Sequence, residues 1–330
     1  MTADEIIGTA AIKRQWGDRA AYLMRPYISD AAYLDMVHCG DAIEVIMHDD
    51  GSAHLGNGWY CRQRFCPGCA WRRSLRDSRI IYGVWEQMLT QHRVPILVGL
   101  TIPNVSGDDL PNAVAGINRA YNRLMRLKRY HEAWRHSIRK LEITYNQRAD
   151  TYHPHLHALI FVDPGYWRDR YINHDTLLQD WRSVTGISCI TQVDVRRCTT
   201  SGTRVGAIAE VAKYCAKSTD YLASQQVFDR MYNALYHKQY ITYSGACATA
   251  RKQLERDYRE QPPTQSGIVQ LLYWWLADSG QYMHTEANII TPKPPPGWHE
   301  MDKTDVAILR LPPAWLSLDW DDIVKEVSSE

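Results

Sequence analysis

The stretch HPHLHALIF, residues 153–161, carries three histidines at two-residue spacing in an otherwise apolar segment. Successive side chains of a β-strand point to opposite faces, so His153, His155 and His157 would share one face of a strand. Imidazole is the commonest metal ligand in proteins, and two imidazoles on one strand can converge on one cation. The alternative is a half-buried strand whose histidines are merely hydrogen-bonded. Three histidines in register favour a metal or catalytic site.

The bulk properties indicate a globular chain long enough for about two domains. Of the 330 residues, 45% are hydrophobic and 23% are charged, which is ordinary for a soluble protein. The most hydrophobic C-terminal piece, IVQLLYWWLA at 268–277, is too short to span a bilayer. The N-terminal segment MTADEIIGTAAIKRQW lacks the layout of a signal peptide, so we expect a cytoplasmic protein without a membrane partner.

Charge is unevenly distributed along the chain, although the net charge is only +1 at pH 7. Residues 119–140 hold eight Arg or Lys and one acidic residue, and residues 62–79 hold six Arg and one acidic residue. The C-terminal segment 298–330 is acidic instead. Basic blocks are typical of nucleic-acid-binding surfaces, although solvated helix faces can have the same composition. Trp71 and Trp134 lie within these blocks and are candidates for stacking on bases.

Hydrophobic periodicity predicts an α+β fold in which single helices alternate with strands suited to antiparallel pairing. The predicted strands cover residues 95–104, 140–146, 153–162 and 189–197, and the second and third form a hairpin. The predicted helices cover residues 110–140, 174–186 and 205–222. We expect three regions, namely 1–92 with the clustered cysteines, 93–250 with the histidine strand, and 251–330 of unknown role.

Three of the eight cysteines lie in one short segment, YCRQRFCPGCAWRRS. Cys61, Cys66 and Cys69 have the spacing C-x4-C-x2-C, and Cys39 precedes them across a segment with strand-like alternation. Clustered cysteines in a chain without a secretory signal are more often metal ligands than disulfides. We therefore expect these four cysteines to form a structural Zn²⁺ site.

Two alternatives to a four-cysteine zinc site remain open. His38 or His54 can replace one of the cysteines, because imidazole is also a zinc ligand. The thiols can also be unligated, as we expect for most of the four other cysteines, which are scattered and have the character of small buried hydrophobes. A site with four protein ligands has no open position, so zinc there would be structural rather than catalytic.

The segment AEVAKYCAK, within the predicted helix 205–222, places Glu210 and Tyr214 four residues apart and therefore on one helical face. Lys217 lies one turn further along, and Lys213 flanks the tyrosine. Nearby lysines lower the pKa of a tyrosine below its reference value of about 10, which favours the phenolate nucleophile. The alternative is an amphipathic surface helix with a half-buried tyrosine, and the segment alone favours this alternative.

Taken in order, GLTIPN, LEITYN, HPHLHALIF and EVAKYCAK resemble the motifs of rolling-circle plasmid replication initiators of the HUH endonuclease superfamily. Those initiators have a Leu-Thr-rich first motif, a His-hydrophobic-His second motif and a third motif with a nucleophilic tyrosine. The cysteine segment is similar to the N-terminal block of one branch, which has a single catalytic tyrosine. The resemblance covers about residues 39–250.

The resemblance implies a role for each matching residue. His155 and His157 match the ligands of a catalytic Mn²⁺ or Mg²⁺ ion, with Glu142 or His153 as the third ligand. Tyr214 matches the nucleophile. The other matches are the glutamate that activates water for the terminating cleavage and two lysines that orient the phosphate or the tyrosine, namely Glu210, Lys213 and Lys217.

The resemblance also implies a fold and a function. The fold would be a central antiparallel sheet with helices on one face, of the ferredoxin or RRM type. The enzyme would nick single-stranded or hairpin DNA at a plasmid origin through a 5′-phosphotyrosine and would recruit a host helicase and polymerase. A transposase or relaxase is the neighbouring alternative, but relaxases carry their tyrosine before the histidines. A zinc-containing DNA-binding regulator without catalysis is the alternative from another class.

Overall fold

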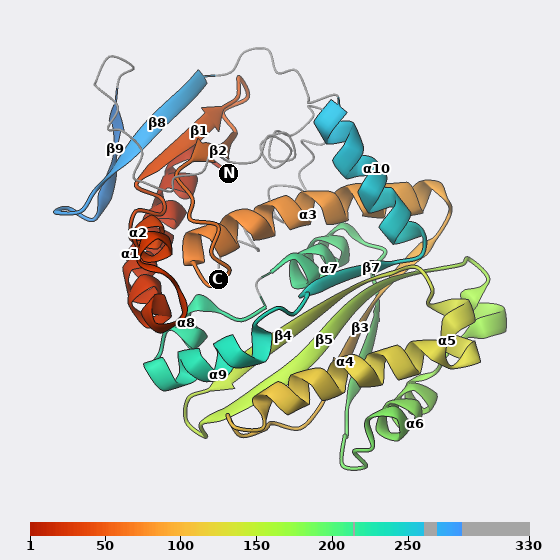
Figure 1. The fold of residues 1–330 in the computed structure, drawn as a ribbon. Coiled ribbons are helices and arrows are strands. Elements are labelled where there is room, and N and C mark those ends of the chain that lie inside the picture. Colours follow the sequence, from red (N-terminus) through yellow and green to blue (C-terminus); the bar gives the residue numbers. More distant parts are fainter. Residues whose placement is uncertain (214, 261–268, 286–330) are drawn as a thin grey trace. The chain divides into compact units, whose positions relative to one another are not determined.

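The structure is a computed structural model that describes residues 1–213, 215–260 and 269–285 (Figure 1). The chain divides into two compact units. Unit 1 comprises Met1–Arg79 with the described residues from Glu255 onward, and unit 2 comprises Ile80–Leu254. Each unit contains its own antiparallel sheet, which confirms the α+β class. The three regions expected from the sequence stay a prediction.

Unit 1 is built on a four-stranded antiparallel sheet in the order β2-β1-β8-β9. Its strands are β1 (Ala42–Met47), β2 (Ala53–Gly58), β8 (Val269–Leu276) and β9 (Gln281–Thr285). Val45 of β1 pairs with Leu271 of β8, so the sheet joins segments that are far apart in sequence. Within the apolar C-terminal run, residues 269–276 therefore form a sheet strand of this unit.

Helices precede and follow the strands of unit 1. They are α1 (Ala3–Met24), η1 (Arg25–Tyr27), α2 (Asp30–Val37), α3 (Pro67–Thr90) and α10 (Ala246–Glu260). The boundary between the units falls inside α3 and inside α10. The helix α1 packs on β1 and β2, and it begins at a capping box in which Thr2 and Glu5 accept hydrogen bonds from each other's backbone N–H.

Unit 2 is built on a five-stranded antiparallel sheet in the order β6-β3-β5-β4-β7. Its strands are β3 (Val94–Thr101), β4 (Ser137–Asn146), β5 (Thr151–Val162), β6 (Val193–Arg197) and β7 (Ile241–Ser244). The predicted hairpin is confirmed, because β4 and β5 pair across the turn at 147–150. The register places Glu142 opposite His155 and Lys140 opposite His157 on the central strands.

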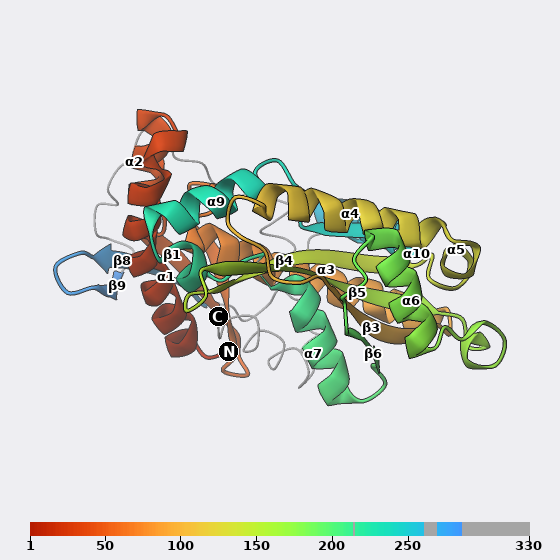
Figure 2. The same cartoon turned by 90° about the horizontal axis from the view of Figure 1, so that it is seen from below.

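Helices cover both faces of this second sheet (Figure 2). They are α4 (Leu110–Arg126), α5 (Lys128–Ala133), η2 (Tyr166–Arg170), α6 (His174–Thr185), α7 (Ser201–Ala212), α8 (Ser218–Tyr221) and α9 (Gln225–Leu235). On one face α4 packs on β5, and α6 and α9 pack on α4. On the other face α7 contacts β4 and β5, and Trp85 of α3 packs edge-on against Phe161 at 5.7 Å between ring centroids.

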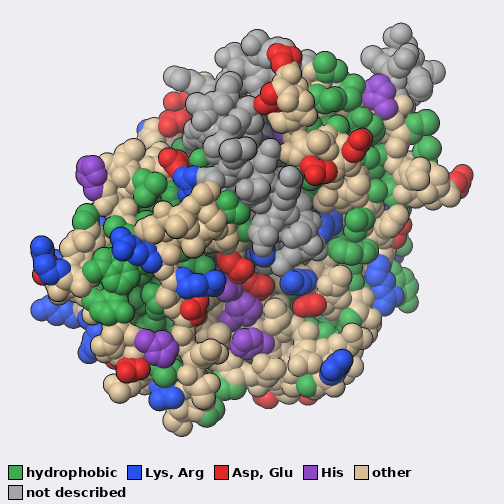
Figure 3. Space-filling view, turned by 180° about the vertical axis from the view of Figure 1, so that it is seen from behind, with side chains coloured by type: hydrophobic (Ala, Val, Ile, Leu, Met, Phe, Trp, Pro, Cys, Tyr) green, Lys and Arg blue, Asp and Glu red, His purple; other side chains and the backbone are tan. Residues whose placement is uncertain are grey.

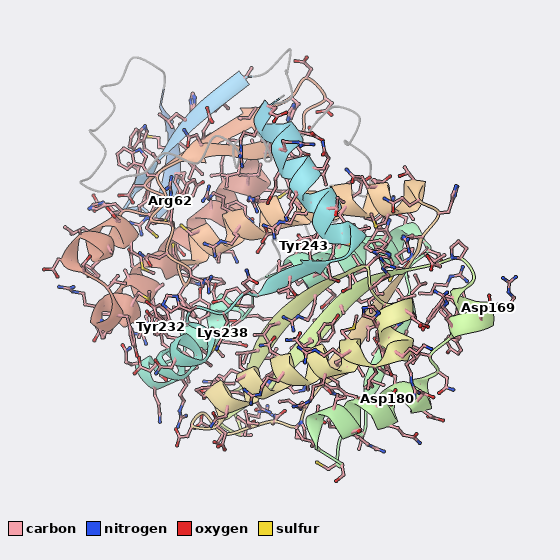
Figure 4. All side chains as sticks on the ribbon, turned by 45° about the vertical axis from the view of Figure 1, so that its right-hand side comes forward. Arg62, Asp169, Asp180, Tyr232, Lys238 and Tyr243 are labelled. Carbon is pink, nitrogen blue, oxygen red and sulfur yellow. The ribbon has the colours of Figure 1, made fainter. Side chains whose placement is uncertain are left out.

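The helical layer of α4 follows from its apolar periodicity. Its buried residues recur at helical spacing and are Leu110, Val114, Ile117, Ala120, Tyr121 and Leu124. Full burial of a large apolar side chain contributes about 1.5–3 kcal/mol, so this stripe fixes α4 on the sheet. The expectation of one helix over 110–140 is wrong beyond Arg126, because Ser137–Lys140 pair with β5 and β7 instead. The intervening α5 is tied to α6 by a 2.9 Å hydrogen bond from Tyr130 to Asp180, a residue of α6 that is labelled in Figure 4.

Candidate functional site

Two histidines of β5 and a glutamate of β4 form a compact group in unit 2. His155 Nε2 and His157 Nε2 each lie 3.6 Å from Glu142 Oε2. One possible ligand atom from each residue lies within 4.8 Å of the other two. The two-residue period of β5 places both imidazoles on one face, and the register with β4 places the carboxylate beside them. The three side chains can therefore reach one cation together.

Unsatisfied polar atoms indicate that a cation fits this group. Glu142 Oε2 and His157 Nδ1 are buried and make no hydrogen bond within the part of the chain that the structure describes. Leaving a buried carboxylate oxygen without a partner costs about 1–3 kcal/mol or more, and a bound cation would remove that cost. The imidazoles of His155 and His157 remain partly exposed. Figure 3 shows histidine and acidic side chains that adjoin on the molecular surface.

The protonation states in the group suit metal binding. Burial opposes ionisation of Glu142, but the neighbouring His155 and the charge of Lys140 outweigh it and lower the pKa of the carboxyl to about 2. Burial and the charge of His155 lower the pKa of His157 to about 4, so its imidazole is neutral near pH 7. For His155 burial, which lowers the pKa, is outweighed by the adjacent Glu142 carboxylate, and its pKa is raised.

His153 does not belong to this group. Its ring stacks on His155, with 5.2 Å between centroids and an interplanar angle of 26°. Burial and the charge of His155 lower the pKa of His153. Of the two candidates for the third ligand, Glu142 is therefore the one that the geometry brings together with the histidine pair.

Glu210 of α7 reaches the same group from the helix packed on that face. Its Oε2 lies 3.4 Å from His157 Nε2, and its Oε1 lies 3.7 Å from Lys213 Nζ. A capping box at Thr200 begins α7, and its last residue is Ala212. Three of the predicted site residues, Glu210, Lys213 and His157, are therefore linked by successive side-chain contacts.

The prediction of one helix over 205–222 is wrong. Lys213 ends α7 with an extended ψ of 170°, and Lys217 is the N-cap of the separate short helix α8. Hydrogen bonds from β4 hold the carbonyls of Lys213 and Cys215, and they replace the helical bonds that would continue α7. The expected helical face from Glu210 to Lys217 is consequently absent. Tyr214 lies outside the described residues.

The four clustered cysteines come together in unit 1. Cys39 follows α2, Cys61 and Cys66 lie in the loop before α3, and Cys69 lies in its first turn. All four are buried, and their Sγ atoms are separated by 3.4 Å (Cys66–Cys39), 3.5 Å (Cys39–Cys69) and 3.7 Å (Cys61–Cys69). Four sulfurs at about 2.3 Å from a tetrahedral zinc lie about 3.8 Å apart, so these thiols fit the ion.

Neither histidine alternative joins the cysteines. His38 Nδ1 lies 2.8 Å from Asp41 Oδ2, and His54 Nδ1 lies 2.8 Å from His48 Nε2. Hydrogen bonds from the other three thiols lower the pKa of Cys69 well below its usual value. A thiolate is thereby favoured at one corner of the group, as metal binding requires. Among the scattered cysteines, Cys198 and Cys247 are buried as expected, whereas Cys189 is exposed and Cys215 is half-buried.

The basic blocks are only partly available for contact with a ligand. Trp71 is 2% exposed and Trp134 is 0% exposed, so the expectation that they stack on bases is wrong. Within 119–140 the exposed cations are Arg119, Arg123, Arg126, Lys128, Arg129 and Arg135. Within 62–79, Arg62 and Arg64 are exposed, and Arg62 is labelled in Figure 4. No helix among the described residues is long and apolar enough to cross a membrane.

Comparison with known proteins finds similarity to replication proteins. A family model described as "Replication protein" matches residues 52–269, which include the histidine strand, Glu142 and three of the clustered cysteines. "Protein rep" of Streptococcus pneumoniae serotype 2 is 30% identical over 224 residues, which cover 66% of this chain and 70% of that protein. "Protein rep" of Staphylococcus aureus is 38% identical over 168 residues, which cover 50% of this chain and 72% of that protein. No solved structure matches the chain significantly.

Proposed function

This chain belongs to the replication protein family, and on that premise we propose that it initiates rolling-circle plasmid replication by nicking single-stranded origin DNA. The oxygen of Tyr214 would bond to phosphorus at the scissile phosphate, and the bond to the 3′ oxygen would break. The Tyr214 phenol would lose its proton in this step, and the departing 3′ oxygen would take up one proton to become a hydroxyl, so the step balances. The product is a 5′-phosphotyrosine, which retains the phosphodiester energy for later strand transfer.

The observation that carries the proposal is the group of Glu142, His155 and His157. A divalent ion bound there would supply Lewis-acid polarisation of the scissile phosphate. Two imidazoles and a carboxylate suit Mn²⁺, and Mg²⁺ is suited when water and phosphate oxygens complete its shell. The low pKa values of Glu142 and His157 keep both side chains in the unprotonated form that a cation needs.

The residues on and after α7 complete the proposed chemistry. Glu210 lies 3.4 Å from His157, and we assign it as the base that takes a proton from water in the terminating cleavage. Attack by water instead of a second tyrosine would release the protein from DNA. Lys213, 3.7 Å from Glu210, would orient the phosphate or the tyrosine, and the resemblance assigns the same type of role to Lys217.

The remaining parts of the proposal concern binding. The four cysteines would hold a structural Zn²⁺, since their separations fit a sulfur tetrahedron. The exposed cations of the two basic blocks would contact phosphates of an origin hairpin, which fixes position rather than sequence. A host helicase and polymerase are the expected partners once the nick has been made.

The test is cleavage of a labelled single-stranded origin hairpin with Mn²⁺, followed on a denaturing gel. Wild type and a matched control, Tyr236→Phe at an exposed tyrosine, should leave protein covalently attached to the 5′ end of the DNA. Tyr214→Phe should form no adduct. Tight binding of the hairpin without cleavage under any divalent ion would instead favour the zinc-containing DNA-binding regulator. Preference for a transposon end or a transfer origin would favour the transposase or relaxase.

A further inference from the structure

The outer edge of β4 is completed by three different segments of unit 2. The strand β7, on which Figure 4 labels Tyr243, pairs with β4 only from Ser137 to Lys140. Beyond that point alternate N–H groups of β4 still point toward the same edge and need acceptors. Each of three such groups donates a hydrogen bond to a different acceptor. The Leu141 N–H donates to Tyr240 O (2.9 Å), and the Ile143 N–H donates to Cys215 O (2.8 Å). The Tyr145 N–H donates to Asp220 Oδ2 (3.1 Å).

A buried lysine adds a fourth bond to this edge. Lys140 is 0% exposed, and its Nζ donates a hydrogen bond to the backbone carbonyl of Lys213. Burying the ammonium group of a lysine costs free energy unless that group is paired. The hydrogen bond to the carbonyl of Lys213 therefore compensates for the burial of Lys140. The strand alternation gives Lys140 the same face as Glu142, and the register places it opposite His157.

The two bonds to residues 213 and 215 start on either side of Glu142. Lys140 precedes Glu142 by two residues and holds the carbonyl of Lys213, and Ile143 follows it directly and holds the carbonyl of Cys215. The carbonyl groups of the residues before and after position 214 are therefore both anchored to the strand that carries a candidate metal ligand. Asp220 extends the same anchoring to the start of α8.

We infer that Lys140 is a positioning residue for the nicking reaction, and that it acts by fixing the peptide before residue 214 to β4 beside Glu142 and His157. The inference rests on the proposed function. Neither the histidine motif nor the tyrosine motif identifies Lys140, because its role depends on a contact with a segment 73 residues later in the chain. It acts through the backbone of Lys213 and needs no contact with DNA.

The test compares single-turnover cleavage by the full chain at saturating Mn²⁺ and saturating hairpin DNA. Lys140→Met should lower the rate constant about 100-fold, because displacement of a reacting group by about 1 Å has an effect of this size. The dissociation constants for hairpin and Mn²⁺ should stay within about threefold of wild type. Lys140→Arg, which retains donors able to reach a carbonyl, should recover at least about tenfold of the lost rate.

Arg139→Met is the matched control. Arg139 is the neighbouring residue of β4, it is 9% exposed, and it lies on the opposite face with its guanidinium over Tyr121. Its substitution removes a buried cation from the same strand, but the cleavage rate constant should stay within about threefold of wild type. Equal losses in Arg139→Met and Lys140→Met would mean a general structural effect and would overturn the inference.

Two further outcomes also count against it. If Lys140→Met cleaves as fast as wild type, or if excess Mn²⁺ restores its rate, Lys140 has no positioning role or acts only through metal affinity. Failure of the wild type to cleave would refute the proposed function instead. If Lys140→Met does not fold, Asp220→Ala decides: a loss of about tenfold at saturating Mn²⁺ supports the anchoring, and an unchanged rate refutes it.

Discussion

The two candidate metal sites of this protein differ in access, ligand chemistry and support. The four thiols of unit 1 are all buried, and they come from two loops and the first turn of a helix. The carboxylate and two imidazoles of unit 2 lie on adjacent central strands, and the imidazoles are partly exposed. The first group offers four donor atoms, enough for a tetrahedral ion, whereas the second offers three.

This difference separates a structural role from a chemical one. Four protein ligands leave an ion no open position, so its binding energy goes into holding loops together. Three ligands on a rigid sheet leave positions for substrate oxygens and water. We therefore expect changes at the thiols to alter stability first, and changes at the histidines to alter catalysis first.

The largest change in the free energy of unfolding should follow from Cys69→Ser. Apparent zinc-binding free energies in small structural sites are about 10–16 kcal/mol, so losing one ligand should abolish zinc binding and destabilise unit 1 by several kcal/mol. Zinc content and hydrogen exchange across residues 39–69 measure this. The control is Cys189→Ser at an exposed cysteine, which should change stability by less than about 0.5 kcal/mol. A Cys69→Ser protein with full zinc content and unchanged exchange would remove the distinction between the sites.

Local patterns predicted the parts of both sites that depend on neighbouring residues. Strand alternation in HPHLHALIF placed the imidazoles correctly on one face, and the hairpin placed Glu142 opposite His155. The cysteine spacing likewise indicated the four residues that gather in unit 1. In each case two-residue periodicity or short loops bring the side chains together, so the sequence contains enough information.

Long-range contacts explain what local patterns missed. The strand β8 pairs with β1 across more than 200 residues of chain, and no local periodicity indicates this partner. Helical propensity suggested one helix from 205 to 222, but bonds from Lys140 and Ile143 to residues 213 and 215 end it. Propensity is a weak prior that tertiary hydrogen bonds override. The buried position of Lys140 depends on the same contacts.

A smaller free-energy change, confined to chemistry, should follow from His157→Ala. Loss of a ligand should lower metal-dependent cleavage about 100-fold or more, and a 100-fold loss corresponds to about 2.7 kcal/mol of transition-state stabilisation. Stability should change by less than about 1 kcal/mol, because the side chain is 15% exposed and its imidazole does not belong to the apolar core. His153→Ala is the matched control, since His153 stacks on His155 outside the ligand group, and its effect should stay below about tenfold. Equal losses in both variants would contradict the assignment of ligands.

The smallest change in the free energy of unfolding should follow from substituting His136, a buried histidine of unit 2 that belongs to neither group. The substitution tests whether a histidine matters for catalysis merely because it is buried. Its Nδ1 accepts a hydrogen bond from the Ala246 N–H (2.9 Å), and burial, with the charges of Arg93 and Arg135, lowers its pKa to about 4. The unfolded chain binds this proton more readily, so the stabilising contribution is full above about pH 6.5 and is lost as the pH falls toward 4.

The measurement is the free energy of unfolding of wild type and His136→Asn at about pH 7.5 and about pH 5. An asparagine oxygen can still accept a hydrogen bond but does not titrate, so wild type should lose on the order of 1 kcal/mol more than the variant between these pH values. Cleavage by the variant at neutral pH should match wild type. If the two proteins show the same pH dependence, His136 is not the titrating group. If instead the variant loses cleavage activity but keeps its stability, a buried histidine outside the ligand group also affects catalysis. Ligand geometry alone would then not explain why one candidate metal site is expected to be structural and the other catalytic.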